Sequence, residues 1–116
     1  MKQSPAPVAQ IKAELFRAMA HPLRVRALEL LVQSERSVGE LATALEVDLS
    51  HLSQQLAVLR RAGVVATRRD GNTIYYSVPN GGIAALLTTA RELIVASLQS
   101  SSSLLASIEN PVEPTR

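Results

Sequence analysis

Residues 48–56 read Asp-Leu-Ser-His-Leu-Ser-Gln-Gln-Leu, and their spacing decides the fold. Leucines recur at three- and four-residue steps as far as Leu59, which is the period of one face of an α-helix. Asp48 is a good N-cap, and Gly63 is suited to end the helix. The pattern therefore predicts a helix over residues 49–62 with its leucines inward and its serines and glutamines outward.

The side of this helix opposite the leucines is polar at its beginning and basic at its end. At about 100° per residue, Ser50, Gln54 and Arg61 lie nearest the outward pole, with His51 and Ser53 on the flanks. Side-chain amides can bond N6 and N7 of adenine, and hydroxyls can donate or accept at several base edges. This line of residues predicts a surface that reads the major groove of DNA, and a plain solvated face is the alternative.

The segments before this helix predict three further helices. Apolar residues at helical spacing predict one over residues 8–20, and Pro22 suits the first turn of a second that ends near Ser34. Ser37 and Glu40 have the spacing of a capping box, which starts a third, short helix. Two helices joined by a tight turn, the second longer and polar on one side, are typical of a helix-turn-helix.

A hairpin is predicted directly after the polar helix. Residues 64–69 and 73–78 are rich in strand-forming residues and flank residues 70–72, Asp-Gly-Asn, which favour a tight turn. Tyr75 and Tyr76 alternate faces, so we expect one in the core and the other half exposed.

A last helix begins after Asn80, which can cap it, and carries an apolar stripe with few charges. The natural burial site of such a stripe is another subunit. Ser100–Ser103 leave two interpretations open, a flexible linker or a helix that continues to Glu109. The second rests on Leu105 and Ile108, which return to the same stripe.

Length and composition predict one soluble domain. The 116 residues suit a single domain, placed at residues 8–109 between proline-punctuated, disordered tails at 1–7 and 110–116. Apolar residues make up 47% but aromatics only 3%, so the core must come from aliphatic residues, which favours helices. With no cysteine, disulfides and thiolate sites are excluded. The apolar stretches look far short of a membrane span, so we expect a cytoplasmic protein without membrane contact.

The net charge of +2 conceals an uneven distribution, because residues 29–48 are mainly acidic and residues 49–79 mainly basic. Arg68 and Arg69 precede the hairpin turn, where a wing touches phosphates or enters a minor groove. Phosphate contacts position a protein on DNA without specifying sequence. The alternative is that the two arginines simply protect an exposed strand edge.

Four motifs in order resemble the ArsR/SmtB family of bacterial winged-helix repressors. They are residues 20–28, 38–42, 52–64 and 71–76, and the likeness covers about residues 11–98. The resemblance implies a mainly α (α+β) winged helix-turn-helix of about five helices, with a two-stranded β-hairpin wing between the fourth and the fifth. It also implies a homodimer joined through the first and last helices, which binds a palindromic double-stranded DNA operator and is usually released by an effector.

The resemblance places groove reading on Ser50, Ser53, Gln54 and Gln55 and wing contacts on Arg68 and Arg69, although Gln55 lies nearer the buried side of the helix. His51 is added as a flanking contact and Arg61 as a residue near the DNA backbone. The predicted DNA-binding residues are thus Ser50, His51, Ser53, Gln54, Gln55, Arg61, Arg68 and Arg69.

The chain departs from the metal-sensing members of the family. The cysteine site of their third helix falls near Ser37, Ala42 and Ala44, and the Asp/His site of their last helix falls on Asn80, Gly82, Leu93 and Ala96. Because metals need converging carboxylate, imidazole or thiolate donors, neither site can be carried over, and we expect no metal cofactor. His21 is expected to pack or cap a helix, and a site of His51 with Asp48 or Glu46 is the weaker alternative.

The sequence therefore predicts a sequence-specific DNA-binding transcriptional regulator, a homodimeric repressor with a possible protein or small-molecule effector. The alternative is a winged-helix protein-interaction module whose DNA binding depends on, or is replaced by, a partner protein. The chain offers no nucleophile with a base and an orienting group, and no glycine loop for phosphate, so we do not expect an enzyme.

Overall fold

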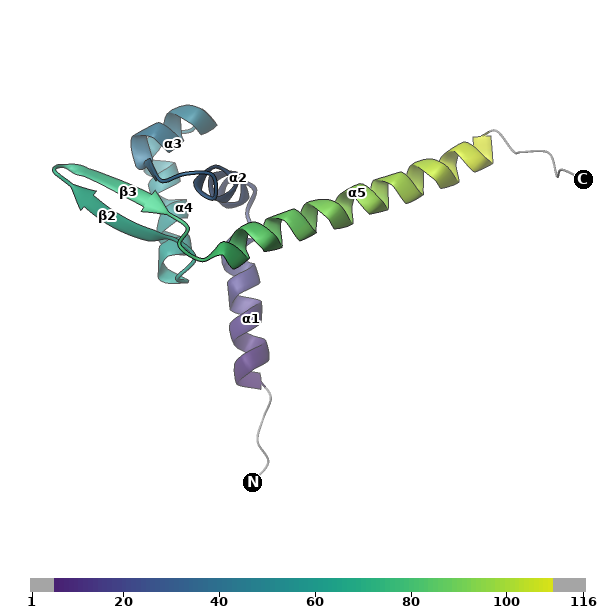
Figure 1. The fold of residues 1–116 in the computed structure, drawn as a ribbon, viewed down its shortest axis with the longest axis horizontal. Coiled ribbons are helices and arrows are strands. Elements are labelled where there is room, and N and C mark those ends of the chain that lie inside the picture. The colour runs from purple at the N-terminus through teal and green to yellow at the C-terminus, as the bar shows by residue number, and fades with distance from the viewer. Residues whose placement is uncertain (1–5, 110–116) are drawn as a thin grey trace, which may run out of the picture. The chain divides into compact units, whose positions relative to one another are not determined.

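The computed structural model describes residues 6–109, in five helices and three short strands (Figure 1). They follow the order α1 (Ala6–Met19), α2 (Pro22–Leu31), β1 (Arg36–Ser37), α3 (Val38–Leu45), α4 (Leu49–Arg61), β2 (Ala66–Asp70), β3 (Thr73–Ser77) and α5 (Gly81–Glu109). The chain divides into two compact parts, one up to Ala84 and one from Ala85. The predicted tails lie outside the described residues, except that Ala6 and Pro7 form the first turn of α1.

The core of the first part is a set of leucines contributed by α2, α3 and α4. The large side chains with 0% exposure are Leu28, Leu41, Leu52, Leu56 and Leu59. The three leucines of α4 in this set confirm the predicted buried side of that helix. Leu49 was predicted to belong with them, but it is 51% exposed, because it stands at the first position of α4, one turn before burial begins.

Three predicted caps set the helix starts. The Ser37 hydroxyl accepts from the Glu40 amide at 3.1 Å while the Glu40 carboxylate accepts from the Ser37 amide at 2.8 Å, which is the reciprocal capping box of α3. His21 Nδ1 accepts from the amide of the second residue of α2 at 3.0 Å, as expected for a capping histidine. Asn80 Oδ1 accepts from the Gly82 amide at 2.7 Å. Each cap satisfies an amide that has no partner inside its helix.

The turn between α3 and α4 is three residues long and contains a left-handed residue. Glu46 has φ 55°, and the next amide, that of Val47, donates to the Ala42 carbonyl at 3.1 Å. This geometry ends α3 and lets α4 begin at once. Gly63, with φ 78°, ends the next helix where glycine was predicted to end it.

Strands β2 and β3 form the predicted hairpin between α4 and α5, and a short third strand, β1, extends it to an antiparallel sheet in the order β1-β3-β2. Strand β1, which was not predicted, pairs Ser37 with Tyr75, and β2 pairs Arg68 with the same tyrosine. Figure 1 shows β2 and β3 projecting from the α2, α3 and α4 group. Tyr75 and Tyr76 are both half-buried, so the expectation of one core tyrosine was wrong: the sheet has partial cover on each face.

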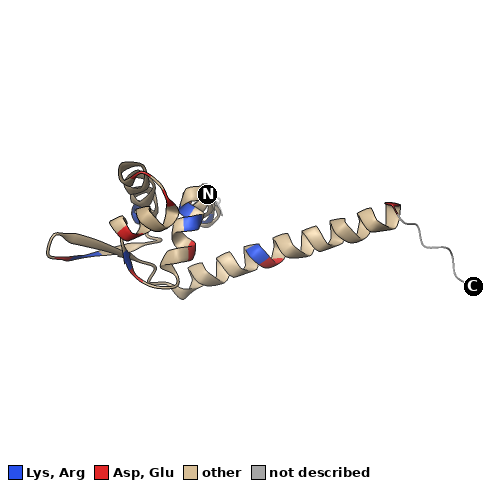
Figure 2. Ribbon diagram, turned by 90° about the horizontal axis from the view of Figure 1, so that it is seen from above, with Lys and Arg blue, Asp and Glu red and all other residues tan. Residues whose placement is uncertain are grey.

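The last helix, α5, runs without interruption from Gly81 to Glu109. Ser100–Ser103 are therefore part of the helix and not a flexible linker. By length and composition alone it could cross a membrane, so the expectation that every apolar stretch falls far short of a span was wrong. Its apolar residues lie mainly on one side, however, with Glu92 and Gln99 on the other. Figure 2 shows charge on α5 only near its middle and at its end.

The capping box makes a stability prediction. Ser37→Ala removes the hydroxyl that accepts from the Glu40 amide, so the free energy of unfolding should fall by about 1 kcal/mol. Thr43→Ala, at an exposed position of the same helix, is the control and should change it by less than about 0.5 kcal/mol. Urea unfolding at matched protein concentration measures both. Equal values for the two variants would show that the cap does not stabilise α3.

Candidate nucleic-acid interface

The outward side of α4 carries the predicted reading residues at the protein surface. Ser50, His51, Ser53, Gln54 and Arg61 are all exposed. Leu52, Leu56 and Leu59 on the other side of α4 are fully buried, so the helix cannot rotate to exchange the two sides. The structure thus brings these five predicted residues together on one accessible edge.

At the beginning of that edge, Ser50 is held by a hydrogen bond to Asp48. The Ser50 hydroxyl donates to Asp48 Oδ2 at 2.7 Å. Asp48 occupies the N-cap position as predicted, but its carboxylate accepts from this hydroxyl and makes no side-chain cap bond to the backbone. Since a serine hydroxyl has one hydrogen and two lone pairs, Ser50 so held presents an acceptor outward.

Gln55 is turned away from the reading edge. Its Oε1 accepts from Arg24 Nε at 2.8 Å, and Arg24 Nη1 donates to the Ala18 carbonyl at 2.8 Å and to the Arg17 carbonyl at 3.3 Å. Arg24 therefore links α4 to the last turn of α1, and half-buried Gln55 is its contact on α4. The resemblance had grouped Gln55 with the reading residues, whereas its place on the helical wheel, nearer the buried side, agrees with this arrangement.

The two wing arginines have different surroundings. Arg68 donates from Nε to Glu35 Oε2 at 2.9 Å and from Nη2 to Glu35 Oε1 at 2.8 Å, which is a two-pronged ion pair. Its guanidinium also lies 4.6 Å from the centre of the Tyr75 ring. Arg69 pairs with Ile74 in the sheet register, so it points to the opposite face, where it is exposed.

The hydrogen bonds from Arg68 lower the pKa of Glu35 below its ordinary value, since they favour the charged carboxylate. A carboxylate with a depressed pKa contributes stability above its unfolded pKa and loses that contribution as the pH falls through the folded value. The Glu35 carboxylate is therefore charged at neutral pH, which is the form that accepts the bonds from Arg68.

Sequence reasoning missed Glu35 and Arg24, the two residues that hold predicted DNA contacts. Glu35 lies 33 positions before its partner and Arg24 lies 31 positions before Gln55. No short-range spacing connects residues so far apart. The one available signal was chemical: an acidic residue next to a predicted turn and an arginine off the apolar stripe of α2, both in need of partners.

Two positions of the family's metal sites have another structural use here. Ser37 and Asn80 are helix caps, as described above. Within residues 6–109, no group of three His, Cys, Asp or Glu side chains is arranged so that it could hold a metal ion. The expectation that the chain needs no metal cofactor stays a prediction.

Comparison with known proteins agrees with this geometry. The family model for the bacterial regulatory protein, arsR family, matches residues 21–67, which include all of α2, α3 and α4. Rv0081 of Mycobacterium tuberculosis, an HTH-type transcriptional regulator, is 55% identical over 89 residues, which are 76% of this chain and 78% of the relative. This chain belongs to the ArsR family. It is a winged-helix DNA-binding regulator of transcription and not an enzyme.

Solved structures of the ArsR family extend the likeness to the fold. The crystal structure of Rv0081 has a TM-score of 0.76 at 50% identity and covers 86% of this chain and 99% of its own. The homodimeric winged helix-turn-helix DNA-binding domain of Mb0332 from Mycobacterium bovis has a TM-score of 0.75 at 31% identity, over 84% of this chain and 93% of its own. The transcriptional repressor BigR from Xylella fastidiosa has a TM-score of 0.68 at 36% identity, over 73% and 87%.

The link between Arg24 and Gln55 makes a prediction about neighbouring glutamines. Gln55→Ala leaves the part-buried Arg24 Nε without its acceptor, so the free energy of unfolding should fall by about 1.5 kcal/mol. Gln54→Ala, at the exposed neighbour, should change it by less than about 0.5 kcal/mol. Urea unfolding of both variants at one protein concentration makes the comparison. If Gln54→Ala were the more destabilising change, the assignment of a structural role to Gln55 would be wrong.

Proposed function

We propose that this ArsR-family protein is a homodimeric repressor that places one α4 helix in the major groove of each half of a palindromic operator. The observation that carries the proposal is the accessible polar edge of α4, backed by leucines that are fully buried. In a helix-turn-helix, the N-terminal part of the second helix contacts the base edges. Ser50, Ser53 and Gln54 occupy that part of α4.

The assembly through α1 and α5 is supported by apolar side chains that water reaches in one chain. On α1, Val8 is 61% and Ile11 65% exposed. On α5, Ile94 is 59%, Leu98 64% and Ile108 67% exposed. Burial of such surface stabilises an assembly by about 25 cal/mol per Å². A second copy of the chain, as in the homodimer of Mb0332, is the partner that we propose for both helices.

Twofold symmetry of the protein accounts for a palindromic operator, because each subunit then presents the same helix to the same half-site sequence. Repression is proposed from the likeness to the repressor BigR. A reporter gene placed behind the chain's own upstream region should be less active when the protein is present. Activation of that reporter would contradict repression while leaving DNA binding intact.

The side chains of α4 have separate roles in this proposal. Gln54 can bond N6 and N7 of one adenine through its amide. Ser50 accepts from a base amino group because its proton is held by Asp48. Arg61 lies at the end of α4 nearer the DNA backbone, and His51 and Ser53 flank the reading line. The wing is proposed to add a contact to the phosphates of the DNA backbone.

The signal that releases the operator is proposed to be a small molecule or a protein rather than a metal, because none of the positions of the family's metal sites carries a strong ligand. Titration of the protein–DNA complex with Zn²⁺, with candidate metabolites and with co-encoded proteins separates these sources. Release by Zn²⁺ at stoichiometric concentration would overturn this part of the proposal.

Gln54 makes the sharpest test of base reading. Gln54→Ala should remove roughly 1–3 kcal/mol of discrimination at one base pair per half-site, because the variant has no amide to bond the base at two points. Fluorescence anisotropy with the operator, with single-base variants and with random DNA measures it. An equal fall in affinity for operator and random DNA would contradict a reading role. A pure protein-interaction module would form no specific complex with any of these DNAs.

Arg69 makes a test of phosphate binding by the wing. Arg69→Ala should weaken binding to all sequences alike and lower the slope of log affinity against log salt by about 0.9 for each phosphate that the side chain neutralises. Arg91→Ala removes an equal charge from α5, which carries none of the proposed DNA contacts, and should leave the slope unchanged as long as size-exclusion chromatography shows that this variant is still a dimer. Anisotropy titrations at several salt concentrations provide the slopes. An unchanged slope for Arg69→Ala would exclude a phosphate contact by this residue.

A further inference from the structure

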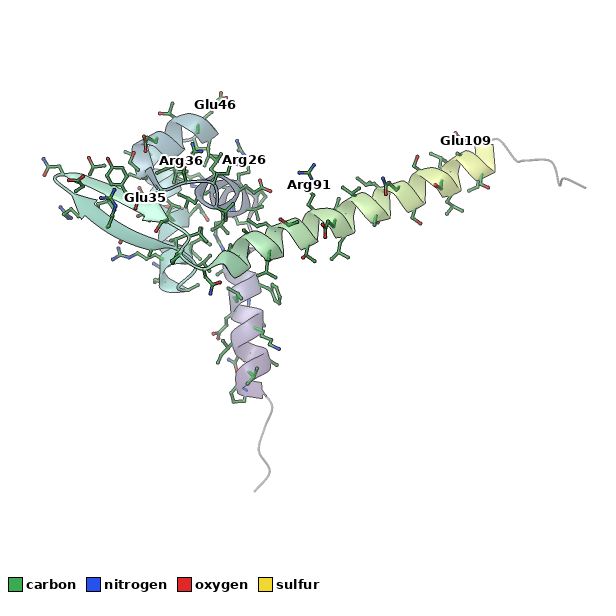
Figure 3. All side chains as sticks on the ribbon, in the orientation of Figure 1. Arg26, Glu35, Arg36, Glu46, Arg91 and Glu109 are labelled. Atoms are coloured by element: carbon green, nitrogen blue, oxygen red, sulfur yellow. The ribbon has the colours of Figure 1, made fainter. Side chains whose placement is uncertain are left out.

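The Glu35–Arg68 ion pair crosses the whole wing sheet. Arg68 lies on β2, the outer strand, and Glu35 directly precedes β1, the strand on the far side of β3. Both carboxylate oxygens of Glu35 are bonded, at 2.8 and 2.9 Å. In Figure 3, Glu35 lies beside the hairpin. The pair thus connects the outer strand to the polypeptide that leads into α3, independently of the strand-to-strand hydrogen bonds.

The register of the sheet explains why these two residues meet. Arg68 is paired with Tyr75, and Tyr75 is paired with Ser37, so the three side chains form one row on one face of the sheet. Glu35 stands two positions before Ser37, which puts it on that same face. The Arg68 guanidinium crosses the Tyr75 ring at 4.6 Å to reach the Glu35 carboxylate. The tyrosine therefore supports the arginine along its path.

This pair ties the wing to the helix-turn-helix itself. Ser37, two residues after Glu35, is the N-cap of α3. A force on the outer strand is thus transmitted through Arg68 and Glu35 to the start of α3, which packs on α4. A planar guanidinium held at two points against a carboxylate fixes direction as well as distance.

The same contacts occupy Arg68. Its Nε and Nη2 donate to Glu35, and its Nη1 lies 3.9 Å from Asp70 Oδ2. A DNA phosphate that took over these two donors would have to displace a carboxylate that already accepts from both of them. Arg69 has no such carboxylate among the ion pairs and hydrogen bonds of residues 6–109, and it points to the other face of the sheet.

We propose that Arg68 is a positioning residue that, with Glu35, sets the direction of the wing, and that Arg69 makes the wing's phosphate contact. This inference rests on the proposed function, since it assigns roles within the same DNA interface. The sequence assigned both arginines to phosphate contacts, whereas this inference gives Arg68 the positioning of the wing and Arg69 the phosphate contact.

The test compares Glu35→Gln, Arg68→Gln and the double variant, with Glu29→Gln as the control for removal of one carboxylate at an exposed position of α2. Both single variants should weaken operator binding by about fivefold, and the double variant should be no weaker than the worse single one, because all three break one pair. The salt slope should stay at the wild-type value in all three. Weaker binding by Glu35→Gln would distinguish a positioning role from a purely electrostatic one, because removal of a negative charge near DNA otherwise strengthens binding.

Two results would overturn the assignment. Tighter binding by Glu35→Gln with a steeper salt slope would mean that Glu35 merely competes with phosphate for Arg68. A lower slope for Arg68→Gln, with unchanged affinity for Glu35→Gln, would mean that Arg68 contacts phosphate directly.

A second measurement separates failure of this inference from failure of the proposed function. Amide hydrogen exchange of the DNA-free wild-type protein and of the same variants reports on β2 and β3 without any operator. Faster exchange in these strands for Glu35→Gln and Arg68→Gln, but not for Glu29→Gln, supports the positioning role even if the DNA tested is not the true operator. Unchanged exchange in the wing would overturn that role whatever the DNA result.

Discussion

Burial of the leucine side of α4 is the constraint on which the rest of the structure depends. Leu52, Leu56 and Leu59 are buried against leucines of α2 and α3. Each such side chain adds about 2–5 kcal/mol to the free energy of unfolding relative to alanine. This packing fixes the rotation of the helix about its own axis. The polar residues of α4 therefore face outward as a consequence of the core, and their surface role needs no separate structural support.

Local patterns in the sequence were sufficient for most of the fold. The capping box at Ser37 and Glu40, the glycine that ends α4 and the cap at Asn80 all depend on residues within a few positions of one another. Strand β1 was beyond such patterns, because two residues form a strand only where β3 offers its free edge. Leu49 was misassigned for a related reason, since periodicity gives the direction of a side chain but not the extent of the neighbour that covers it.

In the candidate site, too, local sequence patterns predict some features and distant residues determine the others. The exposed edge of α4 followed from the helical wheel, whereas the partners of its residues did not. Gln55 bonds to Arg24, and Arg68 bonds to Glu35, across more than thirty positions of chain. Residue type and family likeness put Gln55 and Arg68 with the DNA contacts. The structure shows that polar groups near the proposed recognition surface also bond to one another, and this competition cannot be read from the type of residue alone.

Ser37 belongs to two elements at once, since it is the last residue of β1 and the N-cap of α3. Its backbone position is set by pairing with Tyr75 in the sheet, and its side chain holds the first turn of the helix. Fraying of this strand therefore releases the helix start, and fraying of the helix start loosens the strand. We therefore expect the wing base and the beginning of the helix-turn-helix to open as one cooperative unit rather than as two independent ones.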